Sequence, residues 1–98
     1  MLTSAAIAST VAPYFRDKPV RKAYLFGSVA RNEASSTSDV DILIELDSSQ
    51  LIGLIEYIKM MEGLEALLGR KVDLVSTDAL SPYLKTRIDQ EKVLIYEA

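Results

Sequence analysis

Apolar residues recur along the chain at two different spacings, and each spacing indicates a different kind of element. Near the N-terminus, Ile7, Val11 and Phe15 follow one another at helical spacing, which predicts a helix from Thr3 to about Phe15. Pro13 should end or kink this helix, because its ring removes a backbone donor. Four short segments rich in branched and aromatic residues are predicted to be strands: VRKAYLF (20–26), DVDILIEL (39–46), KVDLVS (71–76) and KVLIY (92–96).

The longest helix is predicted for LIGLIEYIKMMEGLEALLG (51–69), with Gly69 in the position that commonly follows a helix end. Its expected core-facing stripe is Leu51, Leu54, Ile55, Ile58, Met61, Leu64 and Leu68. A second apolar line, Ile52, Met60 and Leu67, either widens this core face or forms an exposed patch for a partner or a second copy. Pro82 should open a helix over PYLKTRIDQ (82–90).

Shorter features complete the pattern. A short helix is expected from Ser28 to about Glu33, and ASSTS (34–38) has the composition of a loop. Strands that alternate with helices on a chain of 98 residues predict one small α/β (α+β) domain spanning residues 1–98. We expect a mixed central sheet of about four strands with helices packed against it.

Composition limits which binding functions and which metal ligands are possible. The formal net charge is −3, from 14 acidic and 11 basic residues, which argues against a protein that grips long nucleic acids non-specifically. Cysteine and histidine are both absent, so any metal should be held by oxygen, as Mg²⁺, Mn²⁺ and Ca²⁺ are. The N-terminus resembles no signal peptide and no apolar run is long enough to cross a bilayer, so we expect a cytoplasmic protein.

The segment 39–46 carries two acids inside an apolar alternation. Val40, Ile42, Ile44 and Leu46 should face one side of the sheet, and Asp39, Asp41, Leu43 and Glu45 the other. The Cα atoms of Asp39 and Asp41 should lie about 6.5–7 Å apart, close enough for both carboxylates to converge on one or two cations. Glu45 is about 13 Å from Asp41 by strand rise, and we expect it to be a surface acid.

A third acid, Asp73, lies between two apolar residues of the next predicted strand. If the two strands lie close together, Asp73 joins Asp39 and Asp41, and three carboxylates that close require a compensating charge such as a divalent metal. The alternatives stay open at this point: Asp39 could be an ordinary acid at a strand edge, and Asp73 could form a surface ion pair with Lys71.

Gly27 and Ser28 lie where a strand should end and a short helix should begin. A helix N-terminus offers free N–H groups to phosphate, glycine allows close backbone approach, and the serine hydroxyl adds a donor. Arg31 could add a cation. Taken singly, the pair could be a capped turn and Arg31 a solvated charge. Taken with the aspartates, they indicate metal-assisted phosphoryl or nucleotidyl transfer.

Gly27-Ser28, ten intervening residues, Asp39-Val-Asp41 and a later strand aspartate, Asp73, together resemble the nucleotidyltransferase superfamily. The fuller run YLFGSVARNEASSTSDVDILIEL resembles the minimal nucleotidyltransferases, small proteins usually encoded beside a HEPN-domain partner. The resemblance implies that Asp39 and Asp41 hold two Mg²⁺ ions and that Asp73 completes the site and helps to activate the attacking hydroxyl. It also implies that Gly27 and Ser28 hold the triphosphate of ATP, assisted by Arg31.

The resemblance further implies an antitoxin, which silences the ribonuclease activity of a HEPN toxin by transferring AMP onto one of its tyrosines. Nothing in the 98 residues looks like a separate domain for holding a nucleic-acid acceptor, so the acceptor is expected to be a protein that brings its own surface. Neither direct nucleic-acid binding nor membrane binding is expected. Assembly as a homo-oligomer or as a hetero-oligomer with the toxin stays open. Two other functions are consistent with these residues: a non-catalytic antitoxin that neutralises its partner by stoichiometric binding, and a sugar-nucleotide transferase with an Asp-x-Asp metal site.

Overall fold

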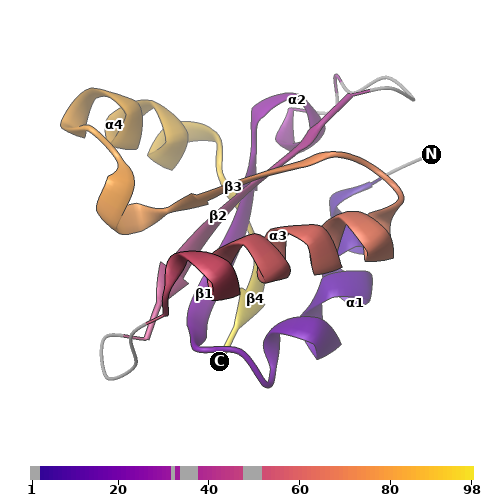
Figure 1. Cartoon of the computed structure of the whole chain (residues 1–98). Coiled ribbons are helices and arrows are strands. Elements are labelled where there is room, and N and C mark those ends of the chain that lie inside the picture. Colours follow the sequence, from indigo (N-terminus) through magenta and orange to yellow (C-terminus); the bar gives the residue numbers. More distant parts are fainter. Residues whose placement is uncertain (1–2, 32, 34–37, 48–51) are drawn as a thin grey trace.

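A four-stranded mixed sheet forms the centre of the protein, with strand order β3-β2-β1-β4 (Figure 1). The computed structural model describes residues 3–31, 33, 38–47 and 52–98. β1 pairs antiparallel with β2 and with β4, whereas β2 and β3 run parallel. The strands are β1 (Val20–Phe26), β2 (Val40–Leu46), β3 (Val72–Ser76) and β4 (Val93–Glu97). The predicted α/β fold with about four strands is therefore confirmed.

Helices connect the strands: α1 (Ser4–Phe15), α2 (Gly27–Ala30), α3 (Leu54–Leu68) and α4 (Pro82–Glu91), with a 3₁₀ helix η1 (Thr77–Ala79). The side chains of Thr3 and Ser81 accept hydrogen bonds from the first turns of α1 and α4, as capping residues do. α3 ends at Leu68 and is followed by Gly69, which has the left-handed φ of 64° expected of a residue beyond a helix end. Among the described residues, no helix combines the length and apolar composition that crossing a membrane requires.

α1 runs through Pro13 and ends at Phe15, as predicted, so Pro13 does not end it. Other observed bounds differ from the predicted ones by one to three residues, and two of these differences concern the residues singled out for chemistry. α2 begins at Gly27, one residue before the predicted start, and has only four residues. β2 begins at Val40, so Asp39 precedes the strand. Residues 34–37 of the expected loop, and Leu51 of the expected helix, lie outside the described residues.

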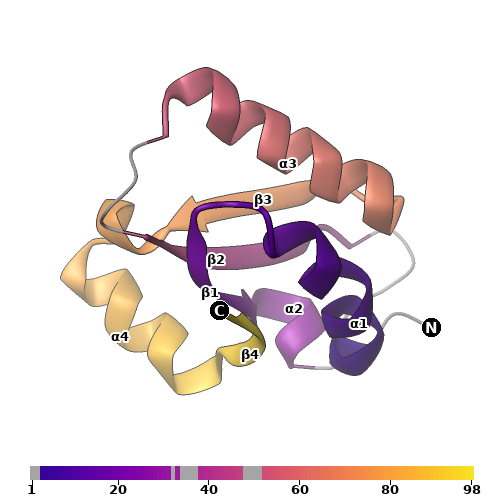
Figure 2. The same cartoon turned by 90° about the horizontal axis from the view of Figure 1, so that it is seen from below.

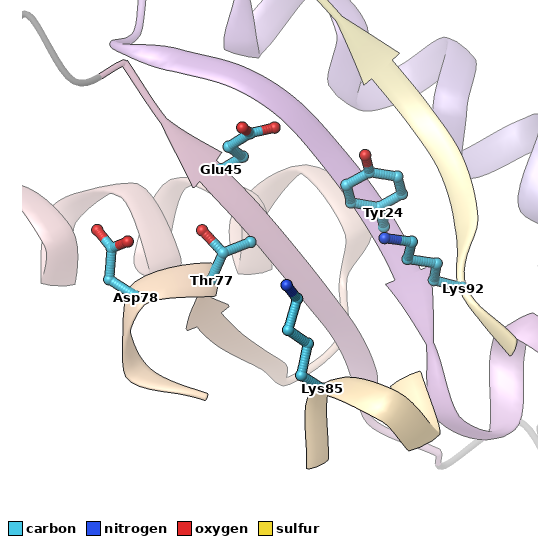
Figure 3. Close-up of a pocket in the computed structure, with 6 residues that line it drawn as sticks. All are labelled: Tyr24, Glu45, Thr77, Asp78, Lys85 and Lys92. Carbon is cyan, nitrogen blue, oxygen red and sulfur yellow. The ribbon is translucent and has the colours of Figure 1, made fainter. Parts of the chain in front are cut away.

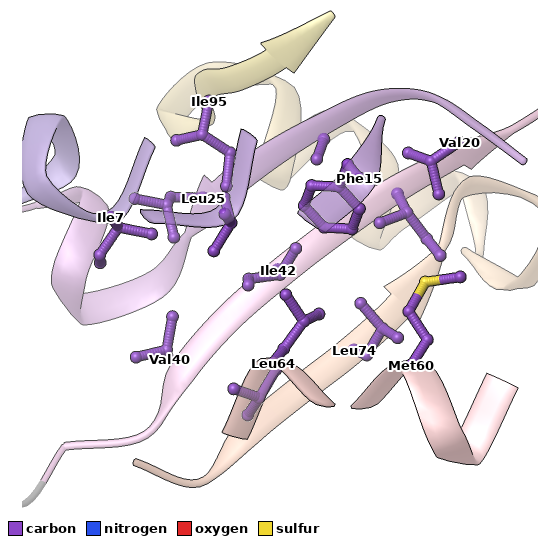
Figure 4. Close-up of a cluster of buried hydrophobic side chains, with 14 of the residues drawn as sticks. Ile7, Phe15, Val20, Leu25, Val40, Ile42, Met60, Leu64, Leu74 and Ile95 are labelled. Atoms are coloured by element: carbon purple, nitrogen blue, oxygen red, sulfur yellow. The ribbon is translucent and has the colours of Figure 1, made fainter. Parts of the chain in front are cut away.

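The main core lies between one face of the sheet and two helices. Figure 2 shows α3 running along the edge strand β3 and α1 beside the other edge strand, β4. Fifteen buried residues make up this cluster, ten of them labelled in Figure 4: Ile7, Phe15, Val20, Leu25, Val40, Ile42, Met60, Leu64, Leu74 and Ile95. Leu43 and Ile88 are also buried but lie outside this cluster.

The predicted apolar stripe of α3 is only partly correct. Met60 and Leu64 are buried, and the half-buried residues packed against the core include Tyr57, Met61 and Leu68. Leu54, Ile55, Ile58 and Leu67 are exposed, with exposed fractions of 75%, 70%, 40% and 46%. The predicted stripe combined residues from two sides of the helix. Ile55 and Leu64 are nine residues apart, which is about two and a half turns, so their side chains point to opposite sides. The second line also divides, since Met60 is buried and Ile52 half-buried while Leu67 is exposed.

A matched pair of substitutions on α3 tests this assignment. Leu64→Ala should lower the free energy of unfolding by about 2–5 kcal/mol, because it opens a cavity in the core. Leu54→Ala makes the same chemical change on an exposed residue and should stay within about 0.5 kcal/mol of the wild type. Urea unfolding measures both, and equal losses in the two variants would contradict the described packing.

Candidate active site

The strand pairing places two of the predicted acids side by side. β2 and β3 run parallel with Asp41 opposite Asp73, near the start of each strand. Neighbouring strands lie about 4.8 Å apart, so the two backbones hold these carboxylates close together. Asp39 precedes β2 and is exposed, Asp41 is half-buried, and Asp73 is exposed. The condition set by the sequence, that the two strands lie close together, is therefore met.

Alternation along the strands directs these side chains away from the main core. Val40 and Ile42 flank Asp41 in β2, and Val72 and Leu74 flank Asp73 in β3; all four are buried in the main core. Because successive side chains in a strand point to opposite faces, Asp41 and Asp73 lie on the other face of the sheet. The apolar face therefore stabilises the fold and leaves the opposite face for chemistry.

The neighbouring carboxylates raise the proton affinity of Asp41. The pKa of Asp41 lies above its ordinary value, first because the group is partly buried and then because Asp73 and Asp39 are nearby. The Arg31 guanidinium opposes this shift. The surface ion pair between Asp73 and Lys71 is not formed among the described residues. An excess of negative charge therefore gathers around Asp41.

The donor set fits a hard cation. Carboxylate oxygens are the ligands that Mg²⁺ prefers, and a divalent ion would relieve the repulsion that raises the pKa of Asp41. As their side chains stand, no three acids among the described residues group tightly enough to hold an ion. Binding therefore requires the side chains of Asp39, Asp41 and Asp73 to turn toward one another on backbones that are already adjacent.

Gly27 lies where β1 ends, against the Asp41 carboxylate. Its predecessor Phe26 pairs with Asp41 across the sheet, and Gly27 itself has a φ of 74°. A Cβ atom at this position would lie 2.1 Å from the Asp41 Oδ2 atom, which is far inside van der Waals contact. Gly27 is thus required twice, for its left-handed backbone and for its missing side chain. The sequence analysis predicted that this glycine lets phosphate approach the backbone closely. In the structure the Asp41 carboxylate lies in that close position.

Arg31 and Gly27 share one acidic partner that the sequence analysis did not identify. The Glu91 Oε1 atom accepts a hydrogen bond of 3.1 Å from the Gly27 N–H, and its Oε2 atom accepts one of 3.1 Å from the Arg31 Nη1 atom. The Arg31 Nε atom also donates to Glu33, at 3.0 Å. Arg31 is therefore no freely solvated charge, and it lies beside the predicted phosphate-binding turn. Ser28 follows Gly27 directly and is half-buried.

A pocket opens on the same face of the sheet, further along β2. Tyr24 pairs with Leu43, two residues from Asp41, so the pocket shares the face that carries the aspartates. Figure 3 shows the residues that line it: Tyr24, Glu45, Thr77, Asp78, Lys85 and Lys92. Glu45, expected to be a surface acid, is half-buried in the wall of this pocket.

Comparison with known proteins finds similarity to one family of transferases. The family model described as Polymerase beta, Nucleotidyltransferase matches residues 9–98. A protein of Thermococcus cleftensis named protein adenylyltransferase MntA is 40% identical over 76 residues, which are 78% of this chain and 75% of that protein. The family match covers the whole sheet, from β1 to β4, and all of the site residues described above.

Solved structures share the fold. A structure attributed to a minimal nucleotidyltransferase is 34% identical, has a TM-score of 0.65, and covers 92% of this chain and 86% of its own. A toxin–antitoxin complex with AMP-PNP gives a TM-score of 0.79 at 22% identity, covering 93% and 73%. A Shewanella oneidensis complex of a tri-AMPylated HEPN toxin with an MNT antitoxin gives 0.73 at 19% identity, covering 98% and 74%. The last two likenesses, below 25% identity, show the fold alone.

Two glycines with left-handed backbones offer a matched test of the packing at Gly27. A Cβ atom at Gly69 would meet nothing within 4 Å, so Gly69→Ala should cost about 1–2 kcal/mol from its backbone alone. Gly27→Ala should cost more, because it also displaces Asp41. Urea unfolding ranks the two variants, and a smaller loss in Gly27→Ala than in Gly69→Ala would contradict the close packing.

The raised pKa of Asp41 predicts how stability depends on pH. Because the folded state holds this proton more tightly than the unfolded state, stability falls as pH rises from the ordinary value of 3.8 through the raised value. Asp41→Asn should therefore raise the melting temperature at pH 7 in EDTA and flatten this part of the profile. In the control Asp89→Asn, an acid whose pKa is lowered first by a hydrogen bond from Lys92, the melting temperature should not rise. A lower melting temperature for Asp41→Asn would count against the repulsion.

Proposed function

The chain belongs to the Polymerase beta, Nucleotidyltransferase family, and on that premise we propose that it transfers AMP from ATP to a tyrosine hydroxyl of a HEPN-domain toxin and so acts as an antitoxin. Support comes from a relative at 40% identity that is named a protein adenylyltransferase. The fold is shared with an MNT antitoxin in complex with a tri-AMPylated HEPN toxin. The observation that carries the proposal is the pairing of Asp41 with Asp73 beside the Gly27 turn.

The acidic residues would hold the metal. Asp39, Asp41 and Asp73 would bind Mg²⁺, with two ions expected from the resemblance to the minimal nucleotidyltransferases. When bound, Mg²⁺ stabilises the charge that develops on the phosphates and the leaving group. The carboxylates that repel one another around Asp41 are the groups that would gain most from such an ion.

The turn after β1 would hold the nucleotide. The N–H and hydroxyl groups of Ser28 would donate to the triphosphate, and Gly27 would keep the backbone close to Asp41. Arg31 would supply a fixed positive charge to the same phosphates. These roles bring the α-phosphorus of ATP to the carboxylates at the starts of β2 and β3.

The transfer step is a substitution at phosphorus. The tyrosine oxygen attacks the α-phosphorus, the bond to the β-phosphate oxygen breaks, and pyrophosphate leaves. The proton of the tyrosine hydroxyl passes to the Asp73 carboxylate, which is exposed on the sheet face and so reachable by a partner. The product is a tyrosine–AMP phosphodiester, which adds bulk and negative charge to the toxin.

A direct assay tests the proposal. The purified chain should be incubated with ATP and Mg²⁺, with and without the protein encoded by the neighbouring gene, and the intact mass of that protein measured. We expect the partner to gain one or more AMP units, and EDTA to prevent this gain. Asp39→Asn and Asp41→Asn should each lower the rate by roughly 100-fold or more, since losing several kcal/mol of charge stabilisation costs a factor of ten per 1.36 kcal/mol.

Glu56→Gln is the control, because it neutralises an exposed acid on α3 and should leave the rate unchanged. A tight complex whose partner gains no mass with ATP, GTP, CTP or UTP would contradict transfer. It would support neutralisation by stoichiometric binding instead.

A further inference from the structure

Glu91 is placed beside the nucleotide turn by the sheet itself. It is the last residue of α4, two residues before Val93, and Val93 pairs with Leu25 in the antiparallel β1–β4 ladder. Gly27 lies two residues after Leu25, so the same register sets it opposite Glu91. Residues distant in sequence are thus brought together by backbone pairing, and the position of the Glu91 carboxylate does not depend on a flexible loop.

The Glu91 carboxylate fixes one side of the Gly27 peptide. Its Oε1 atom accepts the Gly27 N–H at 3.1 Å, while the Asp41 carboxylate lies against the Gly27 α-carbon. The pKa of Glu91 is lowered, first by this backbone hydrogen bond, so the group is ionised at neutral pH. A left-handed glycine that could otherwise adopt many conformations is therefore held between two acids.

The same carboxylate orients Arg31. Glu91 Oε2 accepts from the Arg31 Nη1 atom at 3.1 Å and Glu33 Oε2 from the Nε atom at 3.0 Å. These two hydrogen bonds use two of the five N–H donors of the guanidinium, which leaves donors for an anion. The guanidinium is planar, so fixing two of its nitrogens fixes the direction of the others.

We propose that Glu91 is a positioning residue for the triphosphate of ATP: it holds the Gly27 turn and the Arg31 guanidinium in the geometry that receives the phosphates. This role rests on the proposed function and names a residue that it did not include. The opposite role would be competition, in which the Glu91 carboxylate occupies the Gly27 and Arg31 donors that the phosphates need. If ATP displaced Glu91, the freed carboxylate, tied to α4 and β4, would remain next to a polyanion and repel it. If Glu91 keeps its contacts, its charge stays paired with the Arg31 guanidinium, so the repulsion is weaker.

Two variants separate this role from a simple charge effect. Glu91→Ala and Glu33→Ala each remove one negative charge and one partner of Arg31, but only Glu91 contacts Gly27. We expect Glu91→Ala to weaken the binding of Mg²⁺-ATP about tenfold by calorimetry, in line with the loss of oriented hydrogen bonds. Glu33→Ala should weaken binding only about threefold, because it loosens Arg31 but leaves the Gly27 turn held by Glu91. Glu91→Gln, whose amide oxygen can still accept from Gly27, should lie between them.

Two further readouts separate positioning from general destabilisation. In the transfer assay, Glu91→Ala should raise the KM for ATP and leave kcat nearly unchanged. Without any nucleotide, hydrogen exchange of the Gly27 amide should be faster in Glu91→Ala than in Glu33→Ala, while exchange in β2 is the same in both. If Glu91→Ala fails to fold, Glu91→Gln against Glu33→Gln provides the same comparison.

The outcomes are distinct. Tighter ATP binding by Glu91→Ala would show that Glu91 competes with phosphate and would overturn the proposal. Equal affinities of Glu91→Ala and Glu33→Ala would overturn it as well, because the contact of Glu91 with Gly27 would then contribute nothing to ATP binding. Failure of the wild-type chain to bind ATP, with normal folding, would instead overturn the proposed function, on which this role depends.

Discussion

Parallel pairing between β2 and β3 brings two carboxylates together at the starts of adjacent strands, and the rest of the site is arranged around them. Asp41 and Asp73 are opposite each other in register, so the backbone imposes a repulsion that their side chains can only partly relieve. A sheet built for stability alone would place opposite charges or apolar pairs there. The cost is tolerated because the other face of the same strands contributes to the buried core.

The surrounding elements bring counter-charges and close contacts to this point. Gly27 lets β1 turn within contact of the Asp41 carboxylate, and Arg31 lowers the repulsion from one side. Glu91 then connects the turn to the far end of the chain through the β1–β4 ladder. Residues from β1, α2, β2, β3 and α4 therefore meet in one region, although each element is short. The proposed transfer chemistry needs such a meeting point, because its metal, nucleotide and acceptor must converge there.

Much of this arrangement could be predicted from local pattern, and the rest depends on tertiary contacts. The alternation in DVDILIEL correctly put Asp41 on the face opposite Val40 and Ile42, because strand geometry has a fixed period of two. The role of Glu91 could not be predicted, since nothing near it in sequence shows that it faces Gly27. The buried side of α3 could not be predicted from its sequence, because its own apolar residues point in several directions. Only packing against the sheet decides that Leu64 is buried and Ile55 exposed.

The ionisation of Asp41 offers the most direct test of the central claim, that these carboxylates form a cation-dependent nucleotide site. Its pKa should be measured by carboxyl-carbon NMR, first in EDTA and then with Mg²⁺ and a non-hydrolysable ATP analogue. We expect an Asp41 pKa above the ordinary 3.8 in EDTA and a fall well below it with Mg²⁺ and nucleotide. An Asp41 pKa that does not change on adding both would show that these carboxylates hold no cation with the nucleotide.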